Sequence, residues 1–171
     1  MNNYPTHLMI LQYFKKKENK EQIIAINQYK KILSESNNFL KENNFFEIRD
    51  YKISFEIVSI FLIMFIRINL LEDNRKKYLK VNEELISLFI NDLDESLREK
   101  GIGDMSIGKY VKSYVKKFYF RISKFPEDNN LYKNETFIEY LKITNLIKND
   151  DYDNVSRKFN EKFSDFINSR N

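Results

Sequence analysis

Residues 101–109 read GIGDMSIGK and contain all three glycines of this 171-residue chain. Apolar residues recur at helical spacing on both sides of this stretch. Gly101 therefore stands where a helix ends in a residue with positive φ, a conformation that costs glycine little. Asp104 or Ser106 can accept a hydrogen bond from a free N–H group at the start of the following helix. The stretch therefore predicts a tight turn between two helices.

The same helical periodicity runs through most of the chain, and no strand pattern rises above it. The sequence has only two prolines and no internal repeat or long linker. It therefore predicts an all-α fold, with a single compact domain of about six to seven helices over residues 20–171. We expect a poorly defined N-terminal segment at residues 1–19. The expected helices lie near 20–43, 52–72, 80–100, 106–125, 131–148 and 151–169.

The composition excludes several kinds of functional site. The chain has no cysteine, which rules out disulfides, zinc–thiolate sites and thiol chemistry. The one histidine, His7, lies near the N-terminus with no evident partner, so His-based triads and zinc motifs are absent. The net charge of +4 suits contact with an acidic surface without requiring it. We therefore expect no enzyme, no metal site, no cofactor and no small-molecule substrate.

Two patterns resemble catalytic features but have simpler explanations. Gly103 to Lys109 fits seven of the eight positions of a phosphate-binding loop, but the eighth, which should be Ser or Thr, is Tyr110. The segment also follows an amphipathic helix, whereas a phosphate-binding loop follows a buried strand. Catalysis by carboxylates alone stays open, although a solvated acidic helix face explains the cluster more simply. The clustered carboxylates are Asp92, Asp94, Glu95 and Glu99.

The strongest apolar run extends from Ile57 to Ile66 and is bracketed by Glu56 and Arg67. A helix of this length spans only ~15 Å, against ~30 Å for the core of a bilayer. We therefore expect a helix buried within the protein. If the protein captures an apolar partner, the helix at 52–72 is the best candidate to form the groove.

The helix after the glycines is basic. Residues 105–124 contain six Lys and Arg residues and no acidic residue. On a helical wheel its apolar residues cover one arc, which should face the core. We place the basic side chains on the opposite side, with Phe120 exposed among them. The face is either simply solvated or a docking surface for an acidic helix, RNA or anionic lipid. The expected contact surface consists of Lys109, Lys112, Lys116, Lys117, Phe120 and Arg121.

A longer pattern surrounds the glycines. It has an Asp, then Leu-Arg-Glu, Gly-hydrophobic-Gly-Asp, hydrophobic-Gly-Lys and finally Phe-Tyr-x-Arg. Its main positions are Asp94, Leu97, Arg98, Glu99, Gly101, Gly103, Asp104, Gly108, Lys109, Phe118, Tyr119 and Arg121. This pattern resembles the signature of the ubiquinol–cytochrome c chaperone family, whose members help to assemble respiratory complex III. Weaker matches at Phe55, Glu56 and Arg67 extend the resemblance to about residues 29–148.

The chain departs from the family pattern at two positions. Phe120 replaces the glycine of Phe-Tyr-Gly-Arg, so the close helix approach that this glycine permits does not carry over. Phe61 stands where the family often has a histidine, so a role for that histidine does not carry over either. Four charged residues of the motif are expected to fix the turn and the adjoining helix ends through ion pairs and caps. They are Arg98, Glu99, Asp104 and Lys109.

The resemblance implies a helical, non-enzymatic chaperone that binds newly made cytochrome b, or another complex III subunit, and passes it toward the complex. It also implies contact with the ribosome or with a small partner protein. A mildly basic helical domain can stay soluble and still approach a membrane. We therefore expect a cytoplasmic location with peripheral contact at the inner face of the cytoplasmic membrane. The alternative is a basic helical module that binds RNA or the ribosome and has no cytochrome client.

Overall fold

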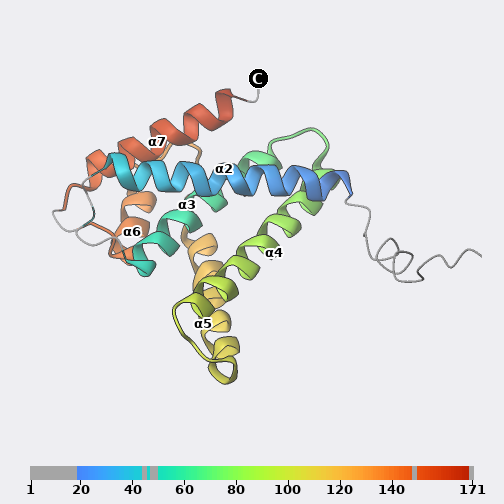
Figure 1. Cartoon of the computed structure of the whole chain (residues 1–171). Helices are drawn as coiled ribbons and strands as arrows, with labels where there is room; N and C mark the ends of the chain where they lie inside the picture. The colour runs from blue at the N-terminus through green and yellow to red at the C-terminus, as the bar shows by residue number, and fades with distance from the viewer. Residues whose placement is uncertain (1–18, 44–45, 47–49, 148–149, 170–171) are drawn as a thin grey trace, which may run out of the picture.

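Helices make up the whole fold in this computed structural model, which describes residues 19–43, 46, 50–147 and 150–169. This part of the chain contains no strand, so the all-α prediction is confirmed, and the helices form a single compact domain (Figure 1). His7 and residues 1–18 lie outside the described residues. The helices are α2 (Lys20–Glu42), α3 (Tyr51–Leu70), α4 (Arg75–Glu99), α5 (Asp104–Lys124), α6 (Glu135–Thr144) and α7 (Tyr152–Asn168).

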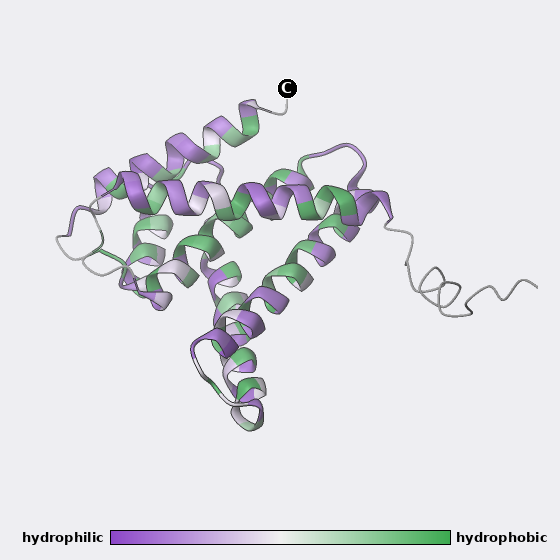
Figure 2. Ribbon diagram, viewed as in Figure 1, coloured by the Kyte–Doolittle hydropathy of each residue, from purple (hydrophilic) through white to green (hydrophobic). Residues whose placement is uncertain are grey.

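Helix α3 is the centre of the fold, and α2, α4, α5 and α7 all pack against it. Figure 2 shows apolar residues along most of α3, whereas α2 and α7 are largely hydrophilic on the side in view. Among the described residues, α3 is the one helix long and apolar enough to cross a membrane. However, 67% of its most apolar stretch is buried within the protein. The prediction of a buried apolar helix is confirmed.

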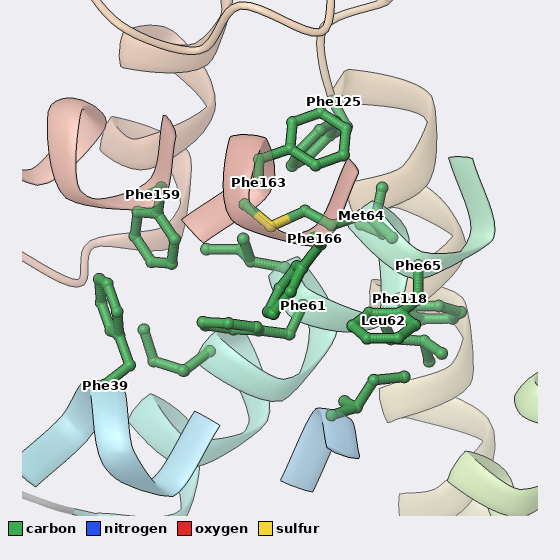
Figure 3. Close-up of a cluster of buried hydrophobic side chains, with 14 of the residues drawn as sticks. Phe39, Phe61, Leu62, Met64, Phe65, Phe118, Phe125, Phe159, Phe163 and Phe166 are labelled. Carbon is green, nitrogen blue, oxygen red and sulfur yellow. The ribbon is translucent and has the colours of Figure 1, made fainter. Parts of the chain in front are cut away.

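Aromatic rings fill the space between α2, α3 and α7 (Figure 3). Phe61 of α3 is fully buried, and its ring centroid lies 5.6 Å from that of Phe39 and 5.8 Å from that of Phe166. Phe39 in turn stacks on Phe159 with the ring centroids 4.4 Å apart. Such aromatic pairs contribute about 0.5–1.5 kcal/mol each beyond the area that they bury. The residue that replaces the family's histidine is therefore part of the hydrophobic core.

Two partly buried polar contacts tie α2 to its neighbours. Asn69 of α3 donates from Nδ2 to Gln28 Oε1 at 2.9 Å and to Asn82 Oδ1 at 2.7 Å, which joins α2, α3 and α4. The Tyr29 hydroxyl of α2 donates to Asp92 Oδ2 of α4 at 2.9 Å. Since buried polar groups are costly unless they are paired, these bonds favour one register of the three helices.

Helices α4 and α6 begin or end at other residues than the sequence predicts, and a capping asparagine sets each of these ends. Helix α4 begins five residues before the expected position, because the Asn74 side chain accepts a hydrogen bond from the Lys77 N–H at 3.2 Å. Helix α6 is shorter than the expected 131–148. Asn134 caps its start, and Asn145, in the left-handed region with φ 52°, ends it.

The glycine turn is a helix stop followed directly by a helix start. The Ile102 N–H donates to the Leu97 carbonyl at 3.2 Å, and the Gly101 N–H donates to the Arg98 carbonyl at 2.8 Å. With Gly101 at φ 84°, this is a Schellman motif, so the predicted positive φ is confirmed. The N-cap of α5 is Gly103, which makes no side-chain cap bond. The predicted cap by Asp104 or Ser106 is therefore wrong.

Gly101 is the glycine that the turn requires, and substitution tests this. Gly101→Val should lower the free energy of unfolding by about 1 kcal/mol or more, because a β-branched residue tolerates positive φ poorly. Gly108 lies inside α5 with no atom within 4 Å of an added Cβ. Gly108→Ala should therefore raise the free energy of unfolding by up to about 1 kcal/mol. Urea denaturation measures both changes, and an unchanged midpoint for Gly101→Val would contradict the assignment.

Buried tyrosines make the fold sensitive to alkali. Burial raises the pKa of Tyr51 to about 12 and also raises the pKa values of Tyr29 and Tyr140. In the unfolded chain a tyrosine loses its proton near pH ~10, so above that pH the folded state holds more protons. Stability should therefore be fully present below this pH and fall as the pH approaches 12. Tyr51→Phe should make the loss of stability with rising pH shallower, as measured by urea midpoints at a series of pH values. An unaltered pH dependence would show that Tyr51 does not contribute to it.

Candidate functional site

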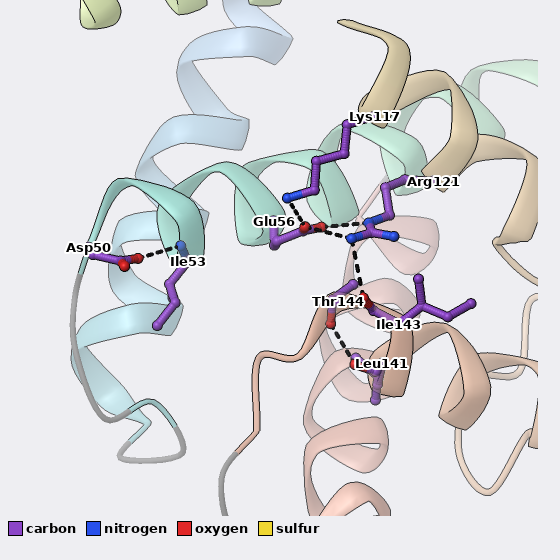
Figure 4. Close-up of polar contacts among 8 residues, drawn as sticks. All are labelled: Asp50, Ile53, Glu56, Lys117, Arg121, Leu141, Ile143 and Thr144. Carbon is purple, nitrogen blue, oxygen red and sulfur yellow. Dashed lines mark hydrogen bonds and ion pairs between the residues drawn. The ribbon is translucent and has the colours of Figure 1, made fainter. Parts of the chain in front are cut away.

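One carboxylate lies in the core without any exposure, that of Glu56 on α3. Arg121 on α5 holds it through two hydrogen bonds, from Nε to Oε2 and from Nη2 to Oε1, each 2.8 Å long. Lys117, one turn earlier on α5, places its ammonium 2.6 Å from Oε1 (Figure 4). The two-point contact matches the planar fork of a guanidinium group, which arginine offers and lysine does not.

Arg121 also reaches a third helix, since its Nη2 donates to the Ile143 carbonyl of α6 at 3.4 Å. Burial lowers the pKa of Arg121, but the hydrogen bonds and the charge of Glu56 outweigh burial and leave it above its ordinary value. Arg121 therefore stays charged, and its contacts with Glu56 and the Ile143 carbonyl join α3, α5 and α6.

The prediction that Arg121 forms part of an exposed contact surface is wrong. Arg121 is only 5% exposed. Seven residues correspond to almost two full helical turns, so Arg121 lies only about 20° from Tyr114 around α5, at the edge of the apolar arc. Lys117 is also partly buried, with its ammonium 5.0 Å from the ring centroid of Phe55. The sequence feature that points to this contact is Glu56 itself. A carboxylate at the start of a buried apolar run needs a cation from elsewhere in the chain.

The remaining residues of the predicted contact surface, Lys109, Lys112, Lys116 and Phe120, are exposed on the outer side of α5. Phe120 is 47% exposed, as the wheel predicts, and Lys124 places its ammonium 5.7 Å from the ring centroid of Phe120. Tyr119 is also exposed, although the sequence marked it only as a motif residue. We call this surface the basic face. It consists of Lys109, Lys112, Lys116, Tyr119, Phe120 and Lys124.

An apolar groove of about 400 Å³, here called the α3 groove, lies at the C-terminal end of α3. Its apolar wall consists of Ile63, Ile66, Leu70, Leu71 and Ile122. Its polar rim consists of Arg67, Glu127 and Asn129. The sequence named the helix at 52–72 as the best candidate to form a groove for an apolar partner, and the α3 groove lies at one end of that helix.

Two contacts shape the groove. Arg67 donates from Nη2 to the Phe125 carbonyl at 3.3 Å, and its guanidinium lies 5.3 Å from the Phe125 ring centroid. These contacts hold the start of the loop after α5 beside the end of α3. Leu71, the C-cap residue of α3, is 58% exposed, so an apolar side chain remains uncovered at the groove.

Most of the motif residues outside the basic face support the turn or the core. Arg98 pairs with Asp94 at 2.5 Å and with Asp104 across the glycine turn, which confirms the expected ion pairs for Arg98 and Asp104. Glu99 and Lys109 make no ion pair with any described residue. Leu97 and Phe118 lie in the core. The motif therefore fixes the turn and the packing of α4 against α5.

Two carboxylates of the acidic cluster on α4 have partners within the fold. Asp92 accepts the Tyr29 hydrogen bond, and Asp94 is paired with Arg98. Within the ranges that the structure describes, no group of three or more His, Cys, Asp or Glu side chains could hold a metal ion. The α3 groove and the basic face are therefore the candidate functional surfaces.

Comparisons with known proteins agree with this fold. A family model described as ubiquinol-cytochrome C chaperone matches residues 51–156, which include the α3 groove and all of α5. The crystal structure of the Cbp3 homolog from Brucella abortus is similar, with a TM-score of 0.65 and 22% sequence identity. The similarity covers 93% of this chain and 88% of that chain, and at this identity it shows a shared fold. No curated protein matches the chain.

Removing one partner of the buried ion pair should be costly. Arg121→Met leaves the Glu56 carboxylate with Lys117 alone, and we expect a loss of about 3–5 kcal/mol in the free energy of unfolding. The double variant Glu56→Gln with Arg121→Met should be more stable than Arg121→Met, because the fully buried side chain is then neutral. The Lys117 side chain is 29% exposed, so its ammonium can turn toward water.

Arg98→Ala is the control, because it removes ion pairs at the exposed glycine turn and should change stability little. Guanidinium chloride would mask charge effects, so urea denaturation is the measurement. If the stability changes of the single variants Glu56→Gln and Arg121→Met sum to that of the double variant, the two side chains are not coupled.

Proposed function

The chain belongs to the ubiquinol-cytochrome C chaperone family, and from this premise we propose that it assists complex III assembly by binding newly made cytochrome b. The observation that carries the client proposal is the α3 groove within the matched region. A membrane protein emerging from the ribosome exposes apolar helices, and a chaperone for it must offer an apolar surface.

The chemistry of the groove suits such a client. Burying one large aliphatic side chain contributes roughly 1.5–3 kcal/mol, so a groove that takes one or two of them gives moderate, reversible binding. Leu70 and Leu71 supply apolar contact area, and Arg67 and Glu127 can bind polar groups at the rim. We infer that the protein acts by holding and releasing its client, with no chemical step.

The proposed cellular location follows from the proposed client, cytochrome b. We propose that the protein works in the cytoplasm beside the inner face of the cytoplasmic membrane, where cytochrome b is inserted. Contact with the ribosome or with a small partner protein would bring it to the emerging chain. A basic module for RNA or ribosome binding, without a cytochrome client, is the second candidate, and the basic face is the observation that favours it.

Client binding can be tested with cytochrome b of the same organism, translated in a cell-free system with the tagged, purified protein. We expect cytochrome b to co-purify with the wild-type protein and to remain bound at high salt, since apolar contacts are not screened. Leu71→Asp places a charge in the α3 groove and should reduce the recovery of cytochrome b by about tenfold or more, since it removes the burial of a leucine.

Leu79→Asp is the matched control, because Leu79 is a similarly exposed leucine on α4 that does not line the α3 groove. It should leave recovery of cytochrome b unchanged. Equal losses for the two variants would remove the groove from the proposal. Recovery of ribosomal RNA and ribosomal proteins alone, lost at high salt, would instead favour the second candidate.

A further inference from the structure

The lysines of the basic face make no internal ion pair with the described residues. Lys109, Lys112, Lys116 and Lys124 make no ion pair with any described residue, whereas Lys117 and Arg121 on the same helix turn inward to Glu56. The four lysines extend over ~22 Å of helix, at 1.5 Å per residue. No acidic residue lies between 105 and 124 to offset them. The basic face is therefore a strip of positive charge whose lysines have no ion-pair partner among the described residues.

Apolar side chains lie among these lysines. Tyr119 and Phe120 are about half exposed, and Met105, on the first turn of α5, is fully exposed. At about 100° per residue these three side chains and Lys112 and Lys116 all point to one side of α5. A half-exposed aromatic ring beside lysines suits the boundary between lipid headgroups and acyl chains.

The shape of the surface also favours a flat, negatively charged partner. Helix α5 and the end of α4 extend away from the rest of the molecule, so the outer side of α5 can approach an extended surface (Figure 1). Gly108 has no side chain, and a shallow depression of about 500 Å³ lies beside it, bordered by Lys109, Lys112 and Lys116. Single-stranded RNA is usually held in a groove that follows its backbone, whereas the depression beside Gly108 is bordered by residues of α5 alone.

We propose that the basic face docks the protein on a bilayer that contains anionic lipids, with lysines on the lipid phosphates and Phe120 at the level of the headgroups. The inference rests on the proposed function for its setting, since a chaperone for a membrane protein works at a bilayer. The buried Glu56–Arg121 pair fixes the rotation of α5, so the lysines stay directed toward the lipid. The α3 groove takes no part in this contact.

Vesicle sedimentation with the full-length protein tests the electrostatic part. Vesicles of phosphatidylglycerol and phosphatidylcholine in equal parts should bind the protein, whereas pure phosphatidylcholine should not. The double variant Lys112→Gln with Lys116→Gln should bind about 25-fold more weakly, at about fivefold for each lysine near an anionic surface. The matched control is Lys76→Gln with Lys80→Gln, an exposed pair at the same spacing on α4, which should bind like the wild type.

The absence of tryptophan from the chain provides a second readout. Phe120→Trp introduces a single tryptophan on the basic face, which can be excited apart from the tyrosines, and its emission should shift to shorter wavelengths when anionic vesicles are added. Tyr132→Trp is the control, because Tyr132 is also exposed but lies in the segment between α5 and α6, and its emission should not shift.

Three results would overturn the inference. These are no sedimentation with anionic vesicles, equal losses for the two lysine pairs, and an emission shift for Tyr132→Trp that matches that of Phe120→Trp. Single-stranded RNA added as a competitor gives the remaining outcome. If RNA displaces the protein from the vesicles, and if RNA binding is lost in the Lys112→Gln, Lys116→Gln variant, the basic face is a nucleic-acid surface. Since no client is present, each result is independent of cytochrome b binding.

Discussion

The buried carboxylate of Glu56 is the constraint on which the arrangement of the helices depends. An ionised group without solvent contact would be very unstable alone, and Arg121 with Lys117 compensates it. Arg121 can do so only when α5 lies beside α3 at one height and one rotation. The interaction therefore sets where the other side chains of α5 point. Ile122 then lines the α3 groove, while the lysines of the basic face point outward.

The motif that marks the family is used mainly for this scaffold. Gly101 ends α4, Arg98 links the two sides of the turn, and Arg121 neutralises Glu56. The surfaces on which function is proposed lie largely at other positions, such as Leu71 and Phe120. Phe120 replaces a glycine of the family pattern, and its exposed ring shows that α5 needs no close helix contact there. In this chain the signature therefore serves the fold more directly than it serves the proposed binding surfaces.

The two proposed surfaces make different physical demands. The α3 groove binds by excluding water from apolar side chains, an interaction that salt does not screen. The basic face acts through long-range charge, which weakens as salt is added. A protein with both could stay at a membrane through the second while it exchanges its client through the first. Because both surfaces involve α5, its fixed rotation about the Glu56 pair matters to both.

The sequence by itself determined the features that neighbours along the chain control. These include the helical periodicity, the positive φ of Gly101, the burial of the apolar run in α3 and the exposure of Phe120. Tertiary structure decided the rest. The Glu56–Arg121 pair joins residues 65 positions apart, and nothing local to Arg121 shows which carboxylate it will meet. The position of the α3 groove depends likewise on how the loop after α5 folds back. Local patterns fix which face of a helix is apolar, but only packing decides which polar groups meet inside and which apolar groups remain uncovered.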